Sequence, residues 1–267
     1  MKPCIFNNMR KISVLLIISF LLCGVFYNIS GAFDIARLSE PDIVMVDRVL
    51  NKLGPFIKQR EADATTPTIT FDDLYSSLDG EERDFLDAFR GMDLKDLGIK
   101  IPYLGEFEPP PDMVVLKGQI IKTKDGEKEL PPQFVPKDVY ERYALMNAMM
   151  KKDIGKGLYV ESGYRSPAYQ LYLLLYYLKY SHDYSLKETL RFVAWPGYSE
   201  HGAPSCQALD FINEFGVNGE ENAQEFEDLE EFKWLVKNAG RYGFVLSYPK
   251  DSDMTYEPWH WRFEEIL

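Results

Sequence analysis

Apolar positions between residues 137 and 263 recur at helix spacing in some segments and alternate in others. Val139, Tyr143, Met146 and Met150 fall on one face of a helix predicted over Lys137–Lys152. The same reading predicts helices over Pro167–Tyr180, Ser185–Trp195 and Asp228–Gly243, and strands over Gly157–Ser162, Ala208–Ile212, Phe244–Tyr248 and Trp259–Phe263. This mixture predicts an α+β fold, with a small central antiparallel sheet flanked by helices.

The part of the chain before this pattern is predicted to be mostly helical. Within Ser77–Met92, apolar residues recur at helix spacing and a glycine stands near the end. A proline cluster, Glu106–Asp112, interrupts regular structure and marks the predicted boundary. We therefore predict a helical N-terminal region over residues 33–105 and a second domain over residues 112–267, with Leu130–Pro136 as an extended connector.

The first 32 residues have the pattern of a secretory leader. Three basic residues precede the uncharged apolar run Ile12–Phe26, which is short for a transmembrane helix and suits a signal-peptide core. Small residues at Ser30 and Ala32 predict cleavage after Ala32. Two alternatives stay open: an uncleaved membrane anchor, and a lipoprotein attached through Cys23, which the bulky residue before that cysteine disfavours.

Removal of this leader changes the charge and the thiol count of the chain. Residues 1–32 carry three positive and no negative charges, so the formal net charge changes from −12 to −15. Such acidity disfavours nucleic acid and anionic lipid as partners. Cys206 becomes the only thiol, which excludes a disulfide within the mature chain. We expect an exported protein, periplasmic or extracellular and associated with the cell wall, that contacts the membrane only if the leader is uncleaved.

Two predicted strands each carry one metal-competent side chain opposite a core-facing side. In Trp259–Phe263, His260 points away from the aromatic residues, and in Ala208–Ile212, Asp210 points away from its two large apolar neighbours. The third candidate ligand is His201, in a glycine-rich loop. Two histidines and one carboxylate, with a fourth position for water, form the donor set of a catalytic zinc site.

A catalytic zinc site also needs a proton acceptor. Metal-bound water supplies hydroxide near neutral pH, and a neighbouring carboxylate takes its proton. Glu257 is the candidate, because Pro258 interrupts strand pairing and allows the preceding side chain to turn toward the metal. On these residues alone the opposite interpretation stays open, since a histidine on the outer face of an antiparallel strand is common and needs no metal.

Three separated motifs resemble those of the VanY-type D-alanyl-D-alanine carboxypeptidases, zinc peptidases that trim peptidoglycan stem peptides. The motif SGYRSPAYQ, from Ser162 to Gln170, resembles the family's substrate-binding element. PGYSEH followed by ALDF resembles the element with the first histidine and the aspartate, and YGFVLSYP followed by YEPWHWRF resembles the closing element. The resemblance covers residues of about 112–267 and leaves 33–105 outside it.

This resemblance implies a ligand set and a reaction. His201, Asp210 and His260 would bind zinc, and Glu257 would be the general base. The expected reaction is hydrolysis of the terminal D-Ala-D-Ala bond of peptidoglycan stem peptides, with metal-bound water as the nucleophile.

The resemblance also assigns substrate contacts. Arg165 would bind the terminal carboxylate of the substrate or the developing oxyanion, which suits a forked, permanently charged donor. Gln170 and Ser199 would add hydrogen bonds in the same cleft. Without the resemblance, these three residues have ordinary interpretations as a turn arginine, a solvent-facing helix residue and a turn serine.

The chain departs from the family pattern at two places. The family reads His-x-x-Gly-x-Ala-x-Asp, whereas Asp210 follows His201 by nine residues, two more than that pattern. A bulged loop could absorb the two residues. Cys206 lies in this insertion, as a further zinc-competent donor or as a small buried thiol. Ser247 stands where the family often has arginine.

Three functional alternatives follow from the same motifs. A dipeptidase, an L,D-carboxypeptidase or an endopeptidase would differ mainly in how loops close the pocket. A non-catalytic peptidoglycan-binding protein could keep the scaffold, although it would not need Glu257. A structural or protein-interaction domain would bind no stoichiometric zinc.

Overall fold

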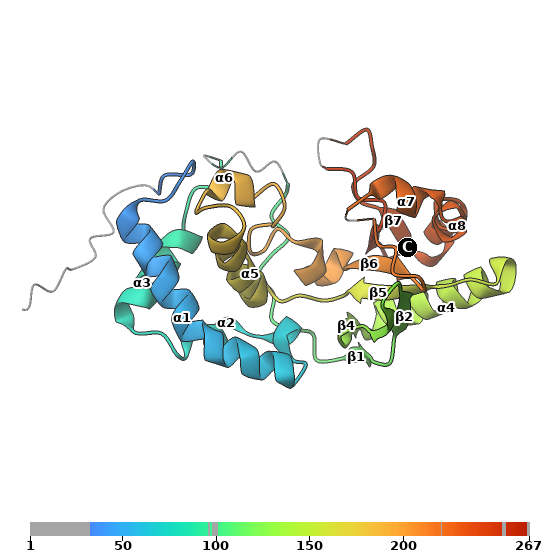
Figure 1. The fold of residues 1–267 in the computed structure, drawn as a ribbon, viewed down its shortest axis with the longest axis horizontal. Helices are drawn as coiled ribbons and strands as arrows, with labels where there is room; N and C mark the ends of the chain where they lie inside the picture. The colour runs from blue at the N-terminus through green and yellow to red at the C-terminus, as the bar shows by residue number, and fades with distance from the viewer. Residues whose placement is uncertain (1–32, 96, 98–100, 220, 253–254, 266–267) are drawn as a thin grey trace, which may run out of the picture.

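The computed structural model describes residues 33–265 except 96, 98–100, 220 and 253–254. It consists of two lobes, one built from helices and one built around a sheet (Figure 1). The helices are α1 (Glu40–Ala62), α2 (Phe71–Tyr75), α3 (Gly80–Arg90), α4 (Lys137–Ile154), α5 (Pro167–Tyr180), α6 (Leu186–Thr189), α7 (Ala223–Asp228) and α8 (Glu230–Asn238). The strands are β1 (Met113–Leu116), β2 (Ile120–Thr123), β3 (Gly126–Glu129), β4 (Gln133–Pro136), β5 (Leu158–Ser162), β6 (Ala208–Asn213), β7 (Phe244–Leu246) and β8 (His260–Phe263).

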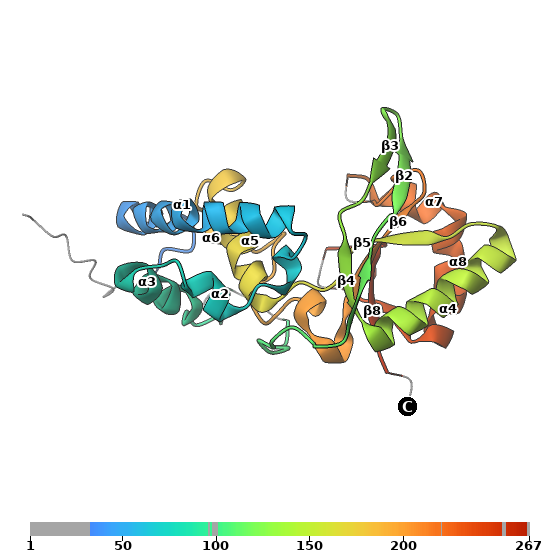
Figure 2. The same ribbon diagram turned by 90° about the horizontal axis from the view of Figure 1, so that it is seen from below.

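The helical lobe combines α1, α2 and α3 with α5 and α6, which come from much later in the chain (Figure 2). Ser39, Thr70, Asp79 and Ser166 cap the N-termini of the four longer helices of this lobe with their side chains. The apolar face of α5 packs into the same core as Phe85 and Phe89 of α3. The core of the helical lobe therefore contains residues of both the predicted N-terminal region and the predicted 112–267 domain. The division of the chain into two domains stays a prediction.

The second lobe has a four-stranded antiparallel sheet in the order β5-β6-β8-β7. Helices α4 and α8 pack against one face of it through Val139, Met146 and Leu235, which share a core with Phe211 and Trp261. Two antiparallel pairs, β1-β4 and β2-β3, lie outside this sheet. The α+β prediction, with a small antiparallel sheet and a helical N-terminal extension, is confirmed.

One local prediction is wrong, and two features of the structure go beyond the predictions. The helix predicted over residues 185–195 ends at Thr189, because the chain turns so that Trp195 can stack on Phe89, with ring centroids 5.2 Å apart. The extended connector 130–136 contains a paired strand, since β4 aligns with β1. The hairpin β2-β3 was not predicted, and its four-residue strands, mostly exposed, lack a continuous apolar pattern.

Within the described residues, no helix is both long and apolar enough to cross a membrane. The predicted leader, its cleavage point and the two cysteines within it lie outside the described residues.

Candidate metal centre

The sheet register brings two of the predicted ligands together. Asp210 of β6 and His260 of β8 are direct partners in the antiparallel ladder. Side chains of such a pair point to the same face and lie close together. The Nδ1 atom of His260 is 2.8 Å from Oδ1 of Asp210. On the opposite face, Leu209 and Trp261 are paired in the same way and enter the core.

A short 3-10 turn, Glu200–Gly202, brings the third candidate ligand to this pair. Ser199 caps the turn, since its hydroxyl accepts a hydrogen bond from the backbone N–H of His201. The Nε2 atom of His201 lies 3.1 Å from Oδ2 of Asp210, and its ring centroid is 5.0 Å from that of His260. The backbone N–H of Arg165 donates to the carbonyl of His201 at 3.0 Å.

Glycine permits this close approach of two backbones. A Cβ atom at Gly202 would lie 2.7 Å from the carbonyl oxygen of Arg165. The SGYR and SEHG motifs therefore pack directly against each other, which explains why a glycine follows the histidine here.

The donor set fits a divalent cation. Ligand atoms of His201, Asp210 and His260 all lie within 4.8 Å of one another. Nδ1 of His201 lies 2.8 Å from the carbonyl of Gly163, which can only accept a hydrogen bond, so this nitrogen carries the proton and Nε2 offers its lone pair to the cluster. Two imidazoles and one carboxylate match the ligands and the ligand number of an open zinc site.

Glu200 is a residue of this centre that the sequence analysis did not single out. Its Oε2 atom lies 2.8 Å from Nε2 of His260, on the opposite side of the ring from Asp210. Arg262 also approaches this carboxylate, at 3.5 Å. Glu200 therefore fixes the ring of His260 with Nδ1 facing the cluster, as outer-shell carboxylates do for metal-bound histidines. Its position directly before His201 was a signal available in the sequence.

Burial and neighbouring charges set the ionisation of the cluster. Burial lowers the pKa of His201, so the neutral imidazole is favoured. Burial also acts on His260, but the carboxylates of Asp210 and Glu200 outweigh it and raise its pKa to about 9. Against its own burial, the two histidines hold the pKa of Asp210 well below its ordinary value. Two carboxylates thus supply the negative charge that a bound cation would neutralise.

Glu257 lies beside the cluster. Its Oε2 atom is 3.9 Å from Nδ1 of His260, and its side chain is 32% exposed, so the carboxylate can reach both the cluster and solvent. The backbone N–H of Glu257 donates to the carbonyl of Tyr248, and the ring of Tyr248 stacks on His260 with centroids 4.8 Å apart. The segment around Pro258 thus holds the carboxylate next to the ligands.

Arg165 precedes the N-cap of α5, beside the cluster. Its backbone N–H contacts the carbonyl of His201, and its positive charge adds to burial in lowering the pKa of that imidazole. Its Nε atom is buried, and the described part of the chain provides no hydrogen-bond partner for it. A buried donor without a partner is costly, so an anionic group of a bound molecule would stabilise it.

The other two predicted substrate contacts, Gln170 and Ser199, are buried side chains. Gln170 is 2% exposed, and its amide nitrogen donates to the carbonyl of Ala194 at 2.8 Å. Ser199 is 8% exposed and caps the turn that carries His201. Both residues hold the loop in front of the centre, and their contact with substrate stays a prediction.

The two-residue insertion forms a turn of its own. Residues Pro204–Cys206 make a second 3-10 turn, in which the backbone N–H of Cys206 donates to Ala203 at 3.0 Å. This turn absorbs the extra length without separating His201 from Asp210. Cys206 is not among the three residues whose ligand atoms converge. It is a partly buried free thiol, and burial raises its pKa, which favours the neutral form over a metal-binding thiolate.

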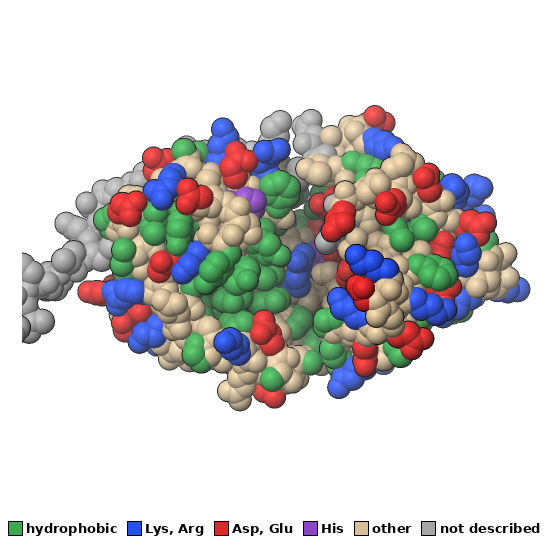
Figure 3. Space-filling view, viewed as in Figure 1, with side chains coloured by type: hydrophobic (Ala, Val, Ile, Leu, Met, Phe, Trp, Pro, Cys, Tyr) green, Lys and Arg blue, Asp and Glu red, His purple; other side chains and the backbone are tan. Residues whose placement is uncertain are grey.

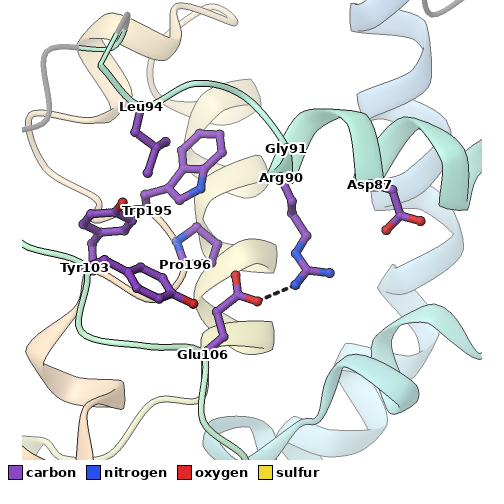
Figure 4. Close-up of a pocket in the computed structure, with 9 residues that line it drawn as sticks. Asp87, Arg90, Gly91, Leu94, Tyr103, Glu106, Trp195 and Pro196 are labelled. Atoms are coloured by element: carbon purple, nitrogen blue, oxygen red, sulfur yellow. Dashed lines mark hydrogen bonds and ion pairs between the residues drawn. The ribbon is translucent and has the colours of Figure 1, made fainter.

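The centre lies where the two lobes meet. The loop with residues 195–206 crosses from the helical lobe to β6 (Figure 1), and the space-filling view shows a hollow between the lobes (Figure 3). A separate pocket of about 290 Å³ lies in the helical lobe beside Trp195, Pro196 and Tyr198 (Figure 4). An ion pair between Arg90 and Glu106 crosses it, and it contains none of the three candidate ligands.

The family model of the VanY D-alanyl-D-alanine carboxypeptidases matches residues 133–266, which is half of the chain. The chain belongs to this family. It is 33% identical over 163 residues to YodJ of Bacillus subtilis (strain 168), covering 60% of this chain and 55% of that protein. It is 29% identical over 135 residues to a D-alanyl-D-alanine carboxypeptidase of Enterococcus faecium, covering 49% of this chain and 37% of the relative.

Among solved structures, the LD-carboxypeptidase LdcB aligns with this VanY-family chain at 27% identity and a TM-score of 0.47. The alignment covers 60% of this chain and 71% of LdcB. The chain thus spans about half the length, or less, of the two curated relatives.

Proposed function

We propose that this protein is a zinc-dependent D,D-carboxypeptidase that removes the terminal D-alanine from peptidoglycan stem peptides ending in D-Ala-D-Ala. The observation that carries the proposal is the convergence of His201, Asp210 and His260 within 4.8 Å, with the Glu257 carboxylate beside them. A zinc ion held by the three ligands would act as a Lewis acid and lower the pKa of a water molecule in the site.

The residues of the chain have separate tasks in this reaction. Glu257 accepts a proton from the water as its oxygen attacks the carbonyl carbon of the scissile bond. The carboxylate then gives this proton to the nitrogen of the departing D-alanine as the C–N bond breaks. Arg165 binds the terminal carboxylate of the substrate through its guanidinium, which keeps the bond in place.

The position of Glu257 supports a hydrolytic enzyme over a protein that only binds peptidoglycan. A protein that only holds a metal or a wall peptide has no use for a carboxylate placed 3.9 Å from a ligand atom and partly open to solvent. Action on wall peptides requires export, which agrees with the leader predicted over residues 1–32. The alternative within the enzyme class is an L,D-carboxypeptidase, the activity that LdcB is named for.

Substrate choice is tested by incubating the zinc-loaded chain with two stem peptides, a pentapeptide ending in D-Ala-D-Ala and the corresponding tetrapeptide. We expect D-alanine from the pentapeptide, and a loss of at least about 100-fold in kcat for Glu257→Gln. Release from the tetrapeptide alone would assign the L,D activity. A zinc-loaded protein that cleaves neither peptide would favour a binding role.

A further inference from the structure

Helix α5 carries a row of tyrosines on its outer side. Tyr169, Tyr172, Tyr176 and Tyr180, called the tyrosine row below, follow one another at spacings of three or four residues, so they share one face of the helix. Successive ring centroids are 6.2, 6.1 and 4.7 Å apart. The rings therefore touch and form one continuous aromatic strip.

Tyr169 and Tyr172 are partly buried against the core of the helical lobe, whereas the outer half of the strip is not needed to bury α5. The opposite face of the helix, with Leu171, Leu174, Leu175 and Leu178, is completely buried in the helical lobe. By contrast, Tyr176 is 41% exposed and Tyr180 is 60% exposed. Large aromatic side chains arranged in the open on one surface usually mark a binding site.

The tyrosine row begins at the candidate metal centre. Arg165 and the N-cap Ser166 directly precede α5: the backbone N–H of Arg165 donates to the carbonyl of His201 at 3.0 Å, and that of Tyr169 donates to the hydroxyl of Ser166 at 3.1 Å. From Tyr169 to Tyr180 the helix rises by about 17 Å. In the space-filling view, apolar side chains gather over α5 beside the hollow between the lobes (Figure 3). The strip therefore leads away from the place where the peptide would be cut.

We propose that the tyrosine row binds the glycan strand to which the stem peptide is attached. This inference rests on the proposed function, because it extends the substrate from the peptide to its neutral chain of N-acetylated sugars. A pyranose ring presents C–H groups to the electron-rich face of an aromatic ring, and the tyrosine hydroxyls can bind the sugar hydroxyls and amides. A row of several rings suits a linear polymer of repeating sugar rings.

The negative charge of the chain disfavours nucleic acid and anionic membranes as ligands of the tyrosine row. The chain has a net charge of −12, which opposes nucleic acid and anionic lipid. The lysine on this part of α5, Lys179, is already paired with Asp47 at 3.0 Å. A row of tyrosines in place of leucines or phenylalanines keeps polar groups at the contact, as a hydrated sugar requires and a lipid core does not.

The test compares two substrates with the same pentapeptide, one free and one attached to its disaccharide. In the full chain, the double variant Tyr176→Ala and Tyr180→Ala is expected to lower kcat/KM for the disaccharide substrate about tenfold, with less than about twofold change for the free peptide. The double variant Tyr176→Phe and Tyr180→Phe keeps the rings and should retain most of the activity. Phe192→Ala removes another exposed aromatic side chain of the same lobe, outside α5, and is the control.

Direct binding separates this inference from the proposed function. The wild-type chain should bind a tetramer of β-1,4-linked N-acetylglucosamine in calorimetry, and the double alanine variant should bind it at least about fivefold more weakly. Equal binding by the two proteins, or no binding, would overturn the inference even if the peptide is cleaved. Tetramer binding that depends on the row would support it even if neither substrate is cleaved. Capture by phosphatidylcholine vesicles, dependent on the row and without tetramer binding, would assign it to a lipid surface.

Discussion

Each histidine of the candidate metal centre is oriented by a second contact on the far side of its ring. His201 donates through Nδ1 to the carbonyl of Gly163, and His260 is held through Nε2 by Glu200. With a cation bound, these contacts would select the tautomer of each imidazole and leave one lone pair facing the cluster. Outer-shell partners of this kind tune metal affinity although they do not touch the metal.

Glu200→Ala is therefore expected to weaken zinc binding by about 10- to 100-fold, because the ring of His260 loses the partner that orients it. The measurement is zinc affinity by equilibrium competition with a chromophoric chelator. Glu200→Gln keeps an acceptor for Nε2–H and should lose less. Glu264→Ala, which removes another carboxylate partner of Arg262, is the control. Unchanged affinity in a folded Glu200→Ala protein would contradict this role.

At the scale of elements, the loop before His201 is fixed by contacts with the segment that follows α3. The carbonyl of Gly197 accepts hydrogen bonds from the backbone N–H groups of Leu104 and Gly105, at 2.8 and 3.1 Å. Tyr103 packs edge to face on Tyr198, with centroids 5.3 Å apart. The position of His201 thus depends on residues from the predicted N-terminal region.

Gly197→Ala tests this dependence. Gly197 has a φ of +77°, and a Cβ atom there would lie 2.5 Å from Cε2 of Tyr103. The strain alone costs about 1–2 kcal/mol, so we expect a lower melting temperature together with reduced activity. Gly240→Ala is the control, since a Cβ atom there meets nothing within 4 Å. A Gly197→Ala protein with the stability and activity of the wild type would show that this contact does not position the loop.

Much of the centre could be predicted from the sequence, because strand alternation is a local property. The alternation around Asp210 and His260 predicted that each side chain lies on the face of its strand opposite the core. The register that makes the two residues direct partners depends on the whole sheet. Glu200 was missed because its one signal, the position directly before His201, is not part of any periodic pattern. The end of α6 was missed because the packing of Trp195 on Phe89 outweighs local helix propensity.

At the scale of the whole molecule, the two larger hydrophobic cores do not follow the order of the chain. One core joins α1, α2 and α3 to α5 and α6, and the other joins the sheet to α4 and α8. Sequence periodicity identifies the apolar face of α5, but it does not say which helices cover that face. The proline cluster at 106–112 marks a connection between the lobes in the chain and not the limit of the helical core.

A fragment of residues 112–267 is therefore expected to fold poorly. It would expose Leu171, Leu174, Leu175 and Leu178, each completely buried in the full chain, which costs of the order of 6 kcal/mol. Gel filtration and thermal unfolding, with residues 33–267 as the control, should show aggregation or a broad transition. A monomeric fragment that unfolds cooperatively at the temperature of the control would contradict this account and support the predicted domain division.

The most direct test of the proposed centre is the zinc content of the purified chain, measured with D-alanine release on the same samples. We predict about one zinc ion per wild-type chain, loss of zinc and activity in Asp210→Ala, and retained zinc without activity in Glu257→Gln. Zinc content that is unchanged in Asp210→Ala, or activity that survives in Glu257→Gln, would contradict the proposed ligand set and general base.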